Sequence, residues 1–565
     1  MYISKIILNN FKSFAGKHEL KLSDGINFFV GNNNCGKTTI FRAIEFIQSG
    51  KSKEEYITKG KESEDVSVEI EFTGTDIEKL VNSDNSGLKK YQDYLIKEKC
   101  NKENCDNETC SIRILRSSKS TSIVQGKKTV NLDIKNIRVY NPNSNEEGIK
   151  RYENPTGIDK TIAALFDVQF VYSDLKNEEY QDFGKTKIIG KIINDLTKDF
   201  QREDDGNGNK TLWGKFKDAH KEAFGDKGLQ KILEDTERKV TKILDEQYGE
   251  GEVKFDFELP EIDSFFKNGV VLVSDNGIAT PVCQKGTGMQ RALALSLIQL
   301  YAEINNKSED SVEKPVIFCI DEPETFLHPN AQNNLMKSFN KLSQRSQILI
   351  TTHSPYLLKA FYEVNQNTDN KPSLKDKLNI FSKEEASKEN ANSKERYSGF
   401  NKKEMLNVSG EYSPTWGEIN YCAFDMPSVE YHIELFNALH KKAIGKHYDK
   451  GKGTVSEKSI SSFDKWLIEQ ETENSTDDNH FNINHVGKPY CKRDKSMSTY
   501  IRNYIDHPGD LIDNHVEKCD CEECSKAVIQ NNIKRTKPSD EEIKKSIEFM
   551  TKIYKNNFCN SGKDA

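Results

Sequence analysis

The sequence predicts an α/β fold built on a covered parallel sheet, followed by a mainly α-helical C-terminal domain. Continuous apolar runs, typical of strands buried on both faces of a sheet, occur at residues 25–30, 315–321 and 347–353. A glycine-bearing loop follows the first run, and a segment with helical spacing follows that loop. From residue 416 onward aromatic residues and helical patterns increase, which predicts a helical unit of residues 416–565.

Composition excludes several classes of protein. The chain has 565 residues, enough for about two to four domains. It carries 82 Lys and Arg against 89 Asp and Glu, a formal net charge of −7, which excludes a globally basic nucleic-acid binder but leaves a local basic groove open. No apolar run approaches the roughly 18 residues of a membrane span, so we expect no membrane partner and a cytoplasmic location. The 12 cysteines are then expected to be reduced thiols or metal ligands.

Other segments of the first half have patterns of their own. Residues 2–8 and 66–72 alternate apolar and polar side chains, which predicts strands, and residues 111–145 indicate further β-structure. We interpret the Asn-, Lys- and Asp-rich residues 82–110 as an insertion. The charged residues 175–250 predict a second, mostly helical insertion that forms an arm or lobe.

Two stretches complete the predicted domain plan. Residues 361–415 contain many Asn, Ser, Lys and Glu, which predicts a linker or mobile loop between a first domain of residues 1–360 and the helical unit. Near the end of the chain, Ser539 and Glu542 have the spacing of a capping box, which predicts the start of a last helix.

The loop after the first buried strand is the strongest motif in the chain. Gly31, Gly36, Lys37 and Thr38 match the phosphate-loop pattern G-x4-G-K-T, with the preceding strand and following helix that the pattern requires. Glycines let backbone N–H groups turn toward phosphates, the lysine supplies positive charge, and the threonine offers a hydroxyl to Mg²⁺. The motif predicts ATP and Mg²⁺ as cofactors. The plainer alternative is a glycine-rich turn with an incidental lysine.

Acidic residues end the second buried strand. There Asp321 could hold Mg²⁺, and Glu322 could polarise an attacking water. The third buried strand ends at His353, at the edge of an open α/β sheet where ligands bind. The alternatives are an acidic turn that caps a helix and a histidine that stabilises a turn.

Together with the segment Gly286-Thr287-Gly288-Met289-Gln290-Arg291, these motifs resemble those of the ABC-type ATPases of the SMC, RecF and OLD group. The other matching segments are Gly31 to Thr39, Asp321-Glu322-Pro323-Glu324 with Leu327-His328-Pro329, and Thr352-His353-Ser354-Pro355. They cover about residues 1–75 and 255–360 in the family's order. The resemblance implies an ABC-type P-loop ATPase head with a helical insertion.

The resemblance also implies roles for individual residues. Glu322 would be the catalytic carboxylate, His353 the γ-phosphate sensor, and Thr38 and Asp321 the Mg²⁺ ligands. The nucleotide-binding loop would comprise Gly31, Asn33, Asn34, Gly36, Lys37, Thr38 and Thr39. Gly286, Gly288 and Gln290 correspond to the ABC signature, which contacts the γ-phosphate bound by the opposite protomer. We therefore expect a homodimer or higher oligomer joined through the ATPase heads.

The C-terminal unit contains a motif that resembles that of HEPN ribonucleases. A TOPRIM nuclease, as in OLD proteins, is not expected because no Val-Glu-Gly turn follows Pro355. Arg502 and His507 instead form an Arg-Asn-x3-His pattern before Pro508, on a predicted helix that separates them by about 140° unless the helix ends or kinks there. The arginine could hold a phosphate and the histidine could move a proton to or from RNA, without a metal. The alternative is a structural Arg–His pair.

Three further groups of residues carry weaker signals. Glu430 or Glu434, on the predicted helix 429–439, would be a polar helper for the Arg–His pair. Zn²⁺ could bind a cluster formed by His515, Cys519, Cys521 and Cys524, or one formed by Cys100, Cys105 and Cys110. Surface thiols are the alternative for both clusters, and the basic stretch 127–135 is either a solvated face or an RNA contact.

These observations leave three functions open. The combination of an ABC-type ATPase with a HEPN-like unit resembles the bacterial anticodon nucleases of anti-phage defence. That resemblance implies the first function, an ATPase whose dimerised heads control a C-terminal, metal-independent RNase in abortive infection, with transfer RNA as the expected target. The second is an ATP-gated scaffold that holds and releases a separate effector nuclease, as Septu-type and PARIS-type ATPases do. The third is a RecF-like DNA repair ATPase, against which the long C-terminal extension counts.

Overall fold

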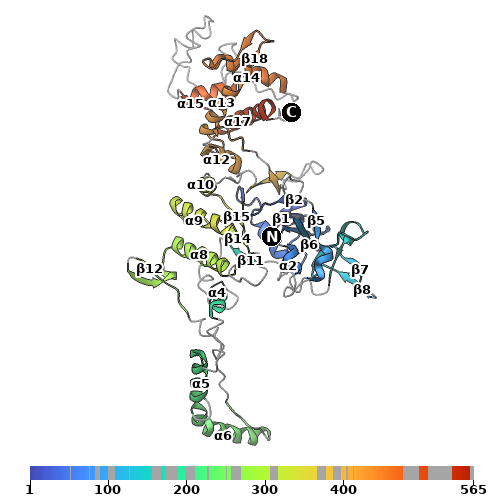
Figure 1. Cartoon of the computed structure of the whole chain (residues 1–565), viewed down its shortest axis with the longest axis vertical. Helices are drawn as coiled ribbons and strands as arrows, with labels where there is room; N and C mark the ends of the chain where they lie inside the picture. Colours follow the sequence, from blue (N-terminus) through green and yellow to red (C-terminus); the bar gives the residue numbers. More distant parts are fainter. Residues whose placement is uncertain are drawn as a thin grey trace.

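The computed structural model places two sheets in the middle of the molecule and helices at both ends (Figure 1). It describes most of the chain, in these segments: 1–50, 52–75, 77–82, 89–98, 109–125, 128–155, 167–172, 188–197, 210–224, 228–249, 251–255, 269–275, 277–305, 316–365, 377–385, 396–401, 405–410, 413–474, 496–506 and 537–559. Within that part, no helix has both the length and the apolar character needed to cross a bilayer.

One sheet is parallel apart from its last strand, as predicted. Its strands, in spatial order, are β11 (Asp167–Val171), β14 (Val316–Asp321), β15 (Gln347–Thr351), β3 (Ile26–Gly31), β16 (Leu378–Glu385) and the antiparallel β17 (Arg396–Asn401). Every residue of β3, β14 and β15 is buried, which explains their continuous apolar runs. Parallel strands bring their carboxyl ends to one edge, so the loops after these three strands meet there.

The other sheet is antiparallel. Its spatial order is β10 (Tyr152–Glu153), β9 (Arg138–Tyr140), β6 (Thr109–Ser117), β4 (Ser67–Gly74), β1 (Tyr2–Phe11) and β2 (Phe14–Lys21), and β5 (Ile96–Glu98) also pairs with β6. A separate hairpin follows β6, formed by β7 (Thr121–Gln125) and β8 (Lys128–Leu132). Helix α1 (Thr39–Ser49) shares a core with both sheets, and its buried residues are Ile40, Phe41, Ala43, Ile44, Phe46 and Ile47. The predicted strands and first helix are thus confirmed.

Helices cover the opposite face of the parallel sheet. There α8 (Thr287–Asn305), α9 (Pro329–Leu342) and α10 (Pro355–Asn365) share a core with alternate residues of β3, β14 and β15. The same core continues into the C-terminal helices. These are α12 (Trp416–Phe424), α13 (Val429–Ala443), α14 (Ile460–Asn474), α15 (Met497–Asp506) and α17 (Asp540–Tyr554). The helical unit is therefore joined to the sheet through packed side chains.

The two predicted insertions contain regular structure where they are described. Residues 82–110 include the 3-10 helix η1 (Lys89–Tyr94), after the short helix α2 (Ile77–Asn82). The range 175–250 includes α4 (Ile188–Thr197), α5 (Leu212–Phe224) and α6 (Leu229–Tyr248), and Figure 1 shows α5 and α6 standing away from the sheets. The described part of this range is helical, as predicted. A small hairpin of β12 (Leu272–Asp275) and β13 (Ile278–Pro281) then leads to α8.

The prediction of a linker or mobile loop over 361–415 is wrong where the range contains regular structure: α10 continues to Asn365, and two strands follow. β16 and β17 lie within this range, and β16 extends the parallel sheet by pairing with β3 from Leu378 opposite Phe28 to Phe381 opposite Gly31. Phe381 is buried between the two sheets. Ladder hydrogen bonds and burial of this ring stabilise the strands despite their polar composition.

Candidate functional site

The loop between β3 and α1 has the shape of a phosphate-binding loop because two positions require glycine. Gly31 and Gly36 have φ angles of +140° and +96°, which are strained for other residues. A Cβ atom on Gly31 would lie 2.3 Å from the carbonyl oxygen of Phe381, and one on Gly36 would lie 2.7 Å from the hydroxyls of Ser13 and Ser398. The loop therefore packs closely against the β16–β17 hairpin and against the turn between β1 and β2.

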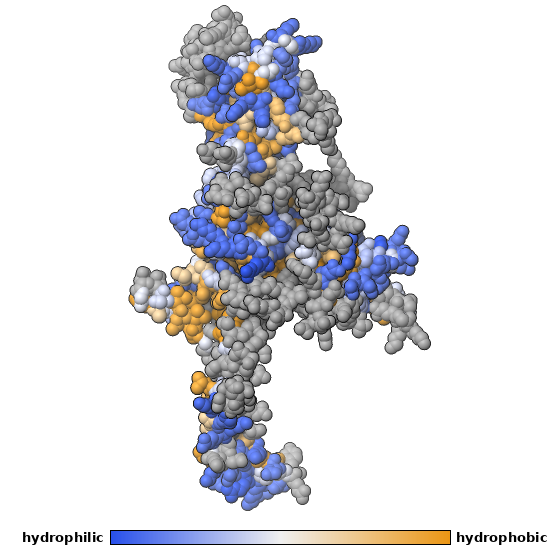
Figure 2. Space-filling model, viewed as in Figure 1, coloured by the Kyte–Doolittle hydropathy of each residue, from blue (hydrophilic) through white to orange (hydrophobic). Residues whose placement is uncertain are grey.

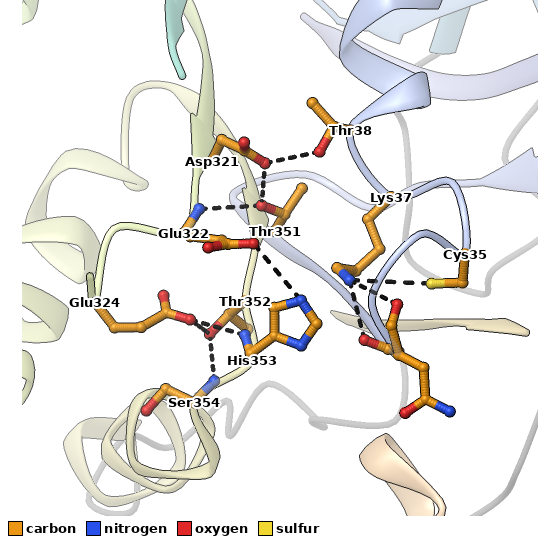
Figure 3. A network of polar contacts seen from close by, with 12 residues as sticks. Cys35, Lys37, Thr38, Asp321, Glu322, Glu324, Thr351, Thr352, His353 and Ser354 are labelled. Atoms are coloured by element: carbon orange, nitrogen blue, oxygen red, sulfur yellow. Dashed lines mark hydrogen bonds and ion pairs between the residues drawn. The ribbon is translucent and has the colours of Figure 1, made fainter. Parts of the chain in front are cut away.

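Lys37 lies inside this loop (Figure 3). Its Nζ donates hydrogen bonds of 3.0 Å to the carbonyl oxygens of Gly31 and Asn32, and lies 4.0 Å from Cys35 Sγ. Burial lowers the pKa of the Lys37 ammonium, and the thiol of Cys35 and the nearby carboxylates oppose that shift. A phosphate oxygen is a stronger acceptor than either carbonyl, so this cation suits an anionic ligand in the loop.

Thr38 and Asp321, the predicted Mg²⁺ ligands, meet at the edge of the parallel sheet. Thr38 Oγ1 donates to Asp321 Oδ1 at 3.0 Å, and Thr351 Oγ1 donates to the same oxygen at 2.5 Å. Arg291, on α8, donates from Nη2 to the backbone oxygen of Asp321 at 2.6 Å. A buried carboxylate with two hydroxyl neighbours is an oxygen donor set that fits Mg²⁺.

Glu322 and His353 face each other next to Lys37 (Figure 3). His353 Nε2 lies 3.6 Å from Glu322 Oε1, and both side chains are about one-third exposed. Burial and the charge of Asp321 raise the pKa of Glu322, whereas burial and the charge of Lys37 lower the pKa of His353. The site thus presents a carboxylate and a neutral imidazole at one accessible point, a combination suited to proton transfer.

The predicted signature residues begin α8. A Cβ on Gly288 would lie 2.8 Å from the backbone oxygen of Phe326, so the first turn of α8 packs closely on the loop after β14. Gln290 Nε2 donates to the backbone oxygen of Lys285 at 2.7 Å, and Gly286 is exposed. Their contact with a γ-phosphate of a second protomer stays a prediction.

Arg502, the predicted RNase residue, lies on α15 as expected. Its Nη2 pairs with Asp506 Oδ2 at 2.5 Å, and its Nη1 donates to Asn503 Oδ1 at 3.1 Å. The polar helper proposed on α13 has another partner, because Glu434 Oε2 accepts a 2.6 Å hydrogen bond from Thr415 Oγ1. His507 lies outside the described residues, so the pairing of Arg502 with His507 stays a prediction.

Both cysteine clusters fall mostly outside the described part of the chain. All four residues of the first cluster lie outside the described residues: His515, Cys519, Cys521 and Cys524. Cys100 and Cys105 of the second cluster also lie outside them. Cys110 is buried in β6, where its Sγ lies 4.0 Å from Glu78 Oε2. Zinc binding stays a prediction.

Sequence reasoning assigned no role to three residues that the fold brings to the site. Thr351 and Arg291 both contact Asp321, and Glu324 contacts the backbone of His353. Each of the three residues lies inside one of the recognised motifs or next to one, and this position was the available signal of a role in the site. The residue that each one contacts lies about 30 positions away in the sequence, and only the folding of the sheet brings the two together.

Comparison with known proteins agrees with this geometry. The family model described as an AAA ATPase domain matches residues 1–358. The Old nuclease of Escherichia phage P2 is 27% identical over 373 residues, covering 64% of this chain and 58% of that protein. Endonuclease GajA of Bacillus cereus strain HuB5-5 is 23% identical over 431 residues, covering 64% and 59%. The chain thus spans less than two thirds of either relative.

A further relative and a solved structure match more narrowly or more distantly. The DNA replication and repair protein RecF of Glaesserella parasuis is 40% identical over 58 residues, covering 10% of this chain and 16% of that protein. A crystal structure of an Smc head bound to the C-terminal winged-helix domain of ScpA aligns with a TM-score of 0.36 and 16% identity, covering 64% of this chain and 92% of that one.

Proposed function

Because the chain belongs to the AAA ATPase domain family, we propose that it hydrolyses ATP in bacterial anti-phage defence and that its nucleotide state controls the C-terminal helices. The observation that carries the proposal is the convergence of Lys37, Thr38, Asp321, Glu322 and His353 at one sheet edge. The nuclease names of two relatives support the link to nucleic-acid cleavage, but their matches leave much of each protein uncovered.

In this proposal each site residue has its own role in ATP hydrolysis. Backbone N–H groups of the loop and the ammonium of Lys37 hold the β- and γ-phosphates. Thr38 and Asp321 would hold Mg²⁺, which when bound neutralises phosphate charge. Glu322 orients the attacking water and accepts its proton, and His353, 3.6 Å from Glu322, would sense the γ-phosphate.

We propose a second copy of the chain as the partner that completes the site. The signature residues lie at the exposed start of α8, where Met289 and the nearby Phe326 expose apolar side chains, and the segment before α8 exposes three more, Val270, Leu272 and Ile278. Figure 2 shows hydrophobic residues gathered over α8. Large exposed apolar surfaces usually mark interaction sites, and a head-to-tail copy would cover this one while bringing its α8 to the bound nucleotide.

Control of the C-terminal helices would run through α10. This helix begins two residues after His353 and packs against α12. The rings of Tyr356 and Trp416 are 4.9 Å apart, and Lys359 Nζ donates to the backbone oxygen of Pro414 at 2.8 Å. A movement of His353 with the γ-phosphate would therefore reach α12 through one rigid element.

The chemistry of the C-terminal unit is the finer part of the proposal. We propose that it is an RNase in which Arg502 holds a phosphate and His507 transfers a proton, with RNA, and transfer RNA first, as substrate. For this role Arg502 must exchange Asp506 for a phosphate, which can also accept two parallel hydrogen bonds from the guanidinium. The second candidate function is a scaffold for a separate effector nuclease, which the Arg502–Asp506 pair favours because it commits the arginine within its own helix.

The ATPase proposal is tested by phosphate release from the purified chain. We expect K37A and E322Q each to reduce turnover at least about 100-fold, because K37A removes the cation that holds the phosphates and E322Q removes the base that accepts the proton of the attacking water. K150A and E146Q, matched changes at exposed positions, should keep wild-type turnover. Normal turnover in K37A or E322Q would contradict the assignment of the site.

The RNase proposal is tested by RNA cleavage and by toxicity without a partner. We expect R502A and H507A each to abolish both, while ATP hydrolysis stays at the wild-type rate. Toxicity that persists in both variants and needs a neighbouring gene would favour the scaffold. Cleavage by the purified wild-type chain that both variants retain would place the nuclease site elsewhere.

A further inference from the structure

Glu324 follows the proposed catalytic carboxylate by two positions, but its side chain points to a different part of the site (Figure 3). Glu324 Oε1 accepts a 2.7 Å hydrogen bond from the backbone N–H of His353 and a 2.8 Å hydrogen bond from Thr352 Oγ1. The other oxygen, Oε2, is buried and has no hydrogen-bond partner among the described residues. Both donors therefore converge on one carboxylate oxygen.

The bonds to Glu324 fix a whole turn of backbone. Thr352 Oγ1, which donates to Glu324, also accepts from the N–H of Ser354 at 2.9 Å. The three residues that follow β15 are thus tied, directly or through the threonine, to the loop after β14. The N–H of Leu327 donates to the backbone oxygen of Glu324 at 2.9 Å, which closes the loop on the other side.

Both glutamates lie close to His353, but at different atoms. Glu322 faces the imidazole ring at 3.6 Å, while Glu324 holds the backbone N–H of the same residue. Glu322 itself has a φ angle of +45°, and its N–H donates to Thr351 Oγ1 at 3.0 Å. The relative position of the carboxylate and the imidazole therefore depends on the contacts between these two loops, since neither loop alone defines it.

We propose that Glu324 is a positioning residue for ATP hydrolysis: its hydrogen bonds to Thr352 and to the backbone of His353 keep the His353 ring beside Glu322. The inference rests on the proposed ATPase function and adds a residue to it. A carboxylate is costly to bury when one of its oxygens has no partner, and burial raises the pKa of Glu324. An apolar side chain would avoid that cost, so the site retains the glutamate for the acceptor that it supplies.

The test compares E324A with E324Q. The amide oxygen of glutamine can accept both hydrogen bonds, whereas alanine removes the acceptor. We expect E324A to lower the turnover of ATP by about 30-fold, because a displacement of about 1 Å at a reacting group is enough for such a loss. E324Q should retain most of the wild-type turnover. Binding of a fluorescent ATP analogue, measured by titration, should change less than about threefold in both, because neither variant touches the phosphate loop.

A second variant keeps the test valid if E324A unfolds. T352V removes one of the two donors to Glu324 and leaves the carboxylate in place, so we expect a smaller loss of turnover, about three- to tenfold. Thermal unfolding of every variant is recorded to separate a folding defect from a positioning defect. In histidine-labelled protein without nucleotide, the NMR signal of His353, assigned with H353Q, should move in E324A and T352V but not in E324Q.

The outcomes separate this inference from the ATPase proposal. Wild-type turnover in folded E324A, or in T352V when E324A does not fold, overturns the positioning role and leaves the ATPase proposal intact. An equal loss of turnover in E324A and E324Q also overturns the positioning role, because the loss would then come from removal of the negative charge. Loss of nucleotide binding parallel to turnover indicates a collapsed site and also overturns it. A wild-type chain without ATP hydrolysis overturns the ATPase proposal and this inference together.

Discussion

At the scale of single residues, the contacts of buried polar groups decide what each can do. In the C-terminal unit His432 is fully buried, with its Nε2 hydrogen-bonded at 2.9 Å to Ser546 Oγ, which is itself 2.8 Å from Ser498 Oγ. His432 Nδ1 has no partner among the described atoms. A proton on this ring would be a buried charge without compensation, so the folded state holds the neutral form.

The stability of the C-terminal unit should therefore fall in acid. Burial lowers the pKa of His432 to about 3, whereas histidines of the unfolded chain keep a pKa of about 6.5. The proton then binds the unfolded chain first, so stability is complete above about pH 6.5 and is lost progressively as the pH falls toward 3. Between pH 7 and pH 5 we expect the wild-type chain to lose about 2 kcal/mol more than H432Q in urea unfolding.

The matched control for this prediction is His447, an exposed histidine of the same unit. H447Q should follow the wild-type dependence on pH. Equal acid sensitivity in wild type and H432Q would show that other groups dominate the acid response of this unit.

At the scale of elements, α10 connects the nucleotide site to the C-terminal helices. Its first turn carries Tyr356, whose ring packs edge-on against Trp416 at the start of α12. About half of each ring is exposed, so this contact lies at the surface of the junction and can be removed without opening the core.

Removal of this aromatic contact should separate ATP hydrolysis from its effect on the C-terminal unit. An aromatic pair contributes about 0.5–1.5 kcal/mol, so we expect Y356A and W416A to fold and to hydrolyse ATP within about twofold of wild type. In wild type, ATP should change hydrogen exchange in α12, α13 and α17, and the two variants should reduce that change. W213A, a change on α5, should keep it. An unchanged ATP response in both junction variants would exclude this contact as the connection.

At the scale of the whole molecule, the apolar surface beside α8 predicts how two copies meet. Phe326 is 72% exposed with a φ angle of +66°, so the loop after β14 holds a large ring out toward solvent. Met289, in the first turn of α8, is also exposed. Phe326 lies in the loop that also carries Glu322, so a partner that covers these residues would contact the loop of the proposed catalytic carboxylate.

We therefore expect ATP to cause dimerisation that depends on this surface. In light scattering, E322Q with ATP should dimerise because it binds ATP without hydrolysing it. The double variants E322Q/F326E and E322Q/M289E should stay monomeric, because a buried unpaired charge at an interface costs several kcal/mol. The control E322Q/I444E carries its change on an exposed residue of the C-terminal unit and should dimerise. Dimers that form equally in all variants would place the interface elsewhere.

The sequence by itself determined the elements whose signals are local. The phosphate loop, the acidic end of β14 and the capping box of Ser539 and Glu542 each depend on residues within about ten positions of one another. Backbone conformation, glycine requirements and helix caps follow from such short spacings, so the predicted strands, first helix and capping box are confirmed, while nucleotide binding stays a prediction.

The tertiary structure alone decided which distant residues share a function. Composition predicted a linker over 361–415, but pairing with β3 makes strands of β16 and β17 and places Phe381 against the phosphate loop. Glu324 meets His353 only because β14 and β15 are neighbours in the sheet, and the C-terminal helices join the ATPase core only because α10 meets α12. Pairing between strands and packing between helices depend on partners far apart in the chain, whose identity the local pattern of side chains does not contain.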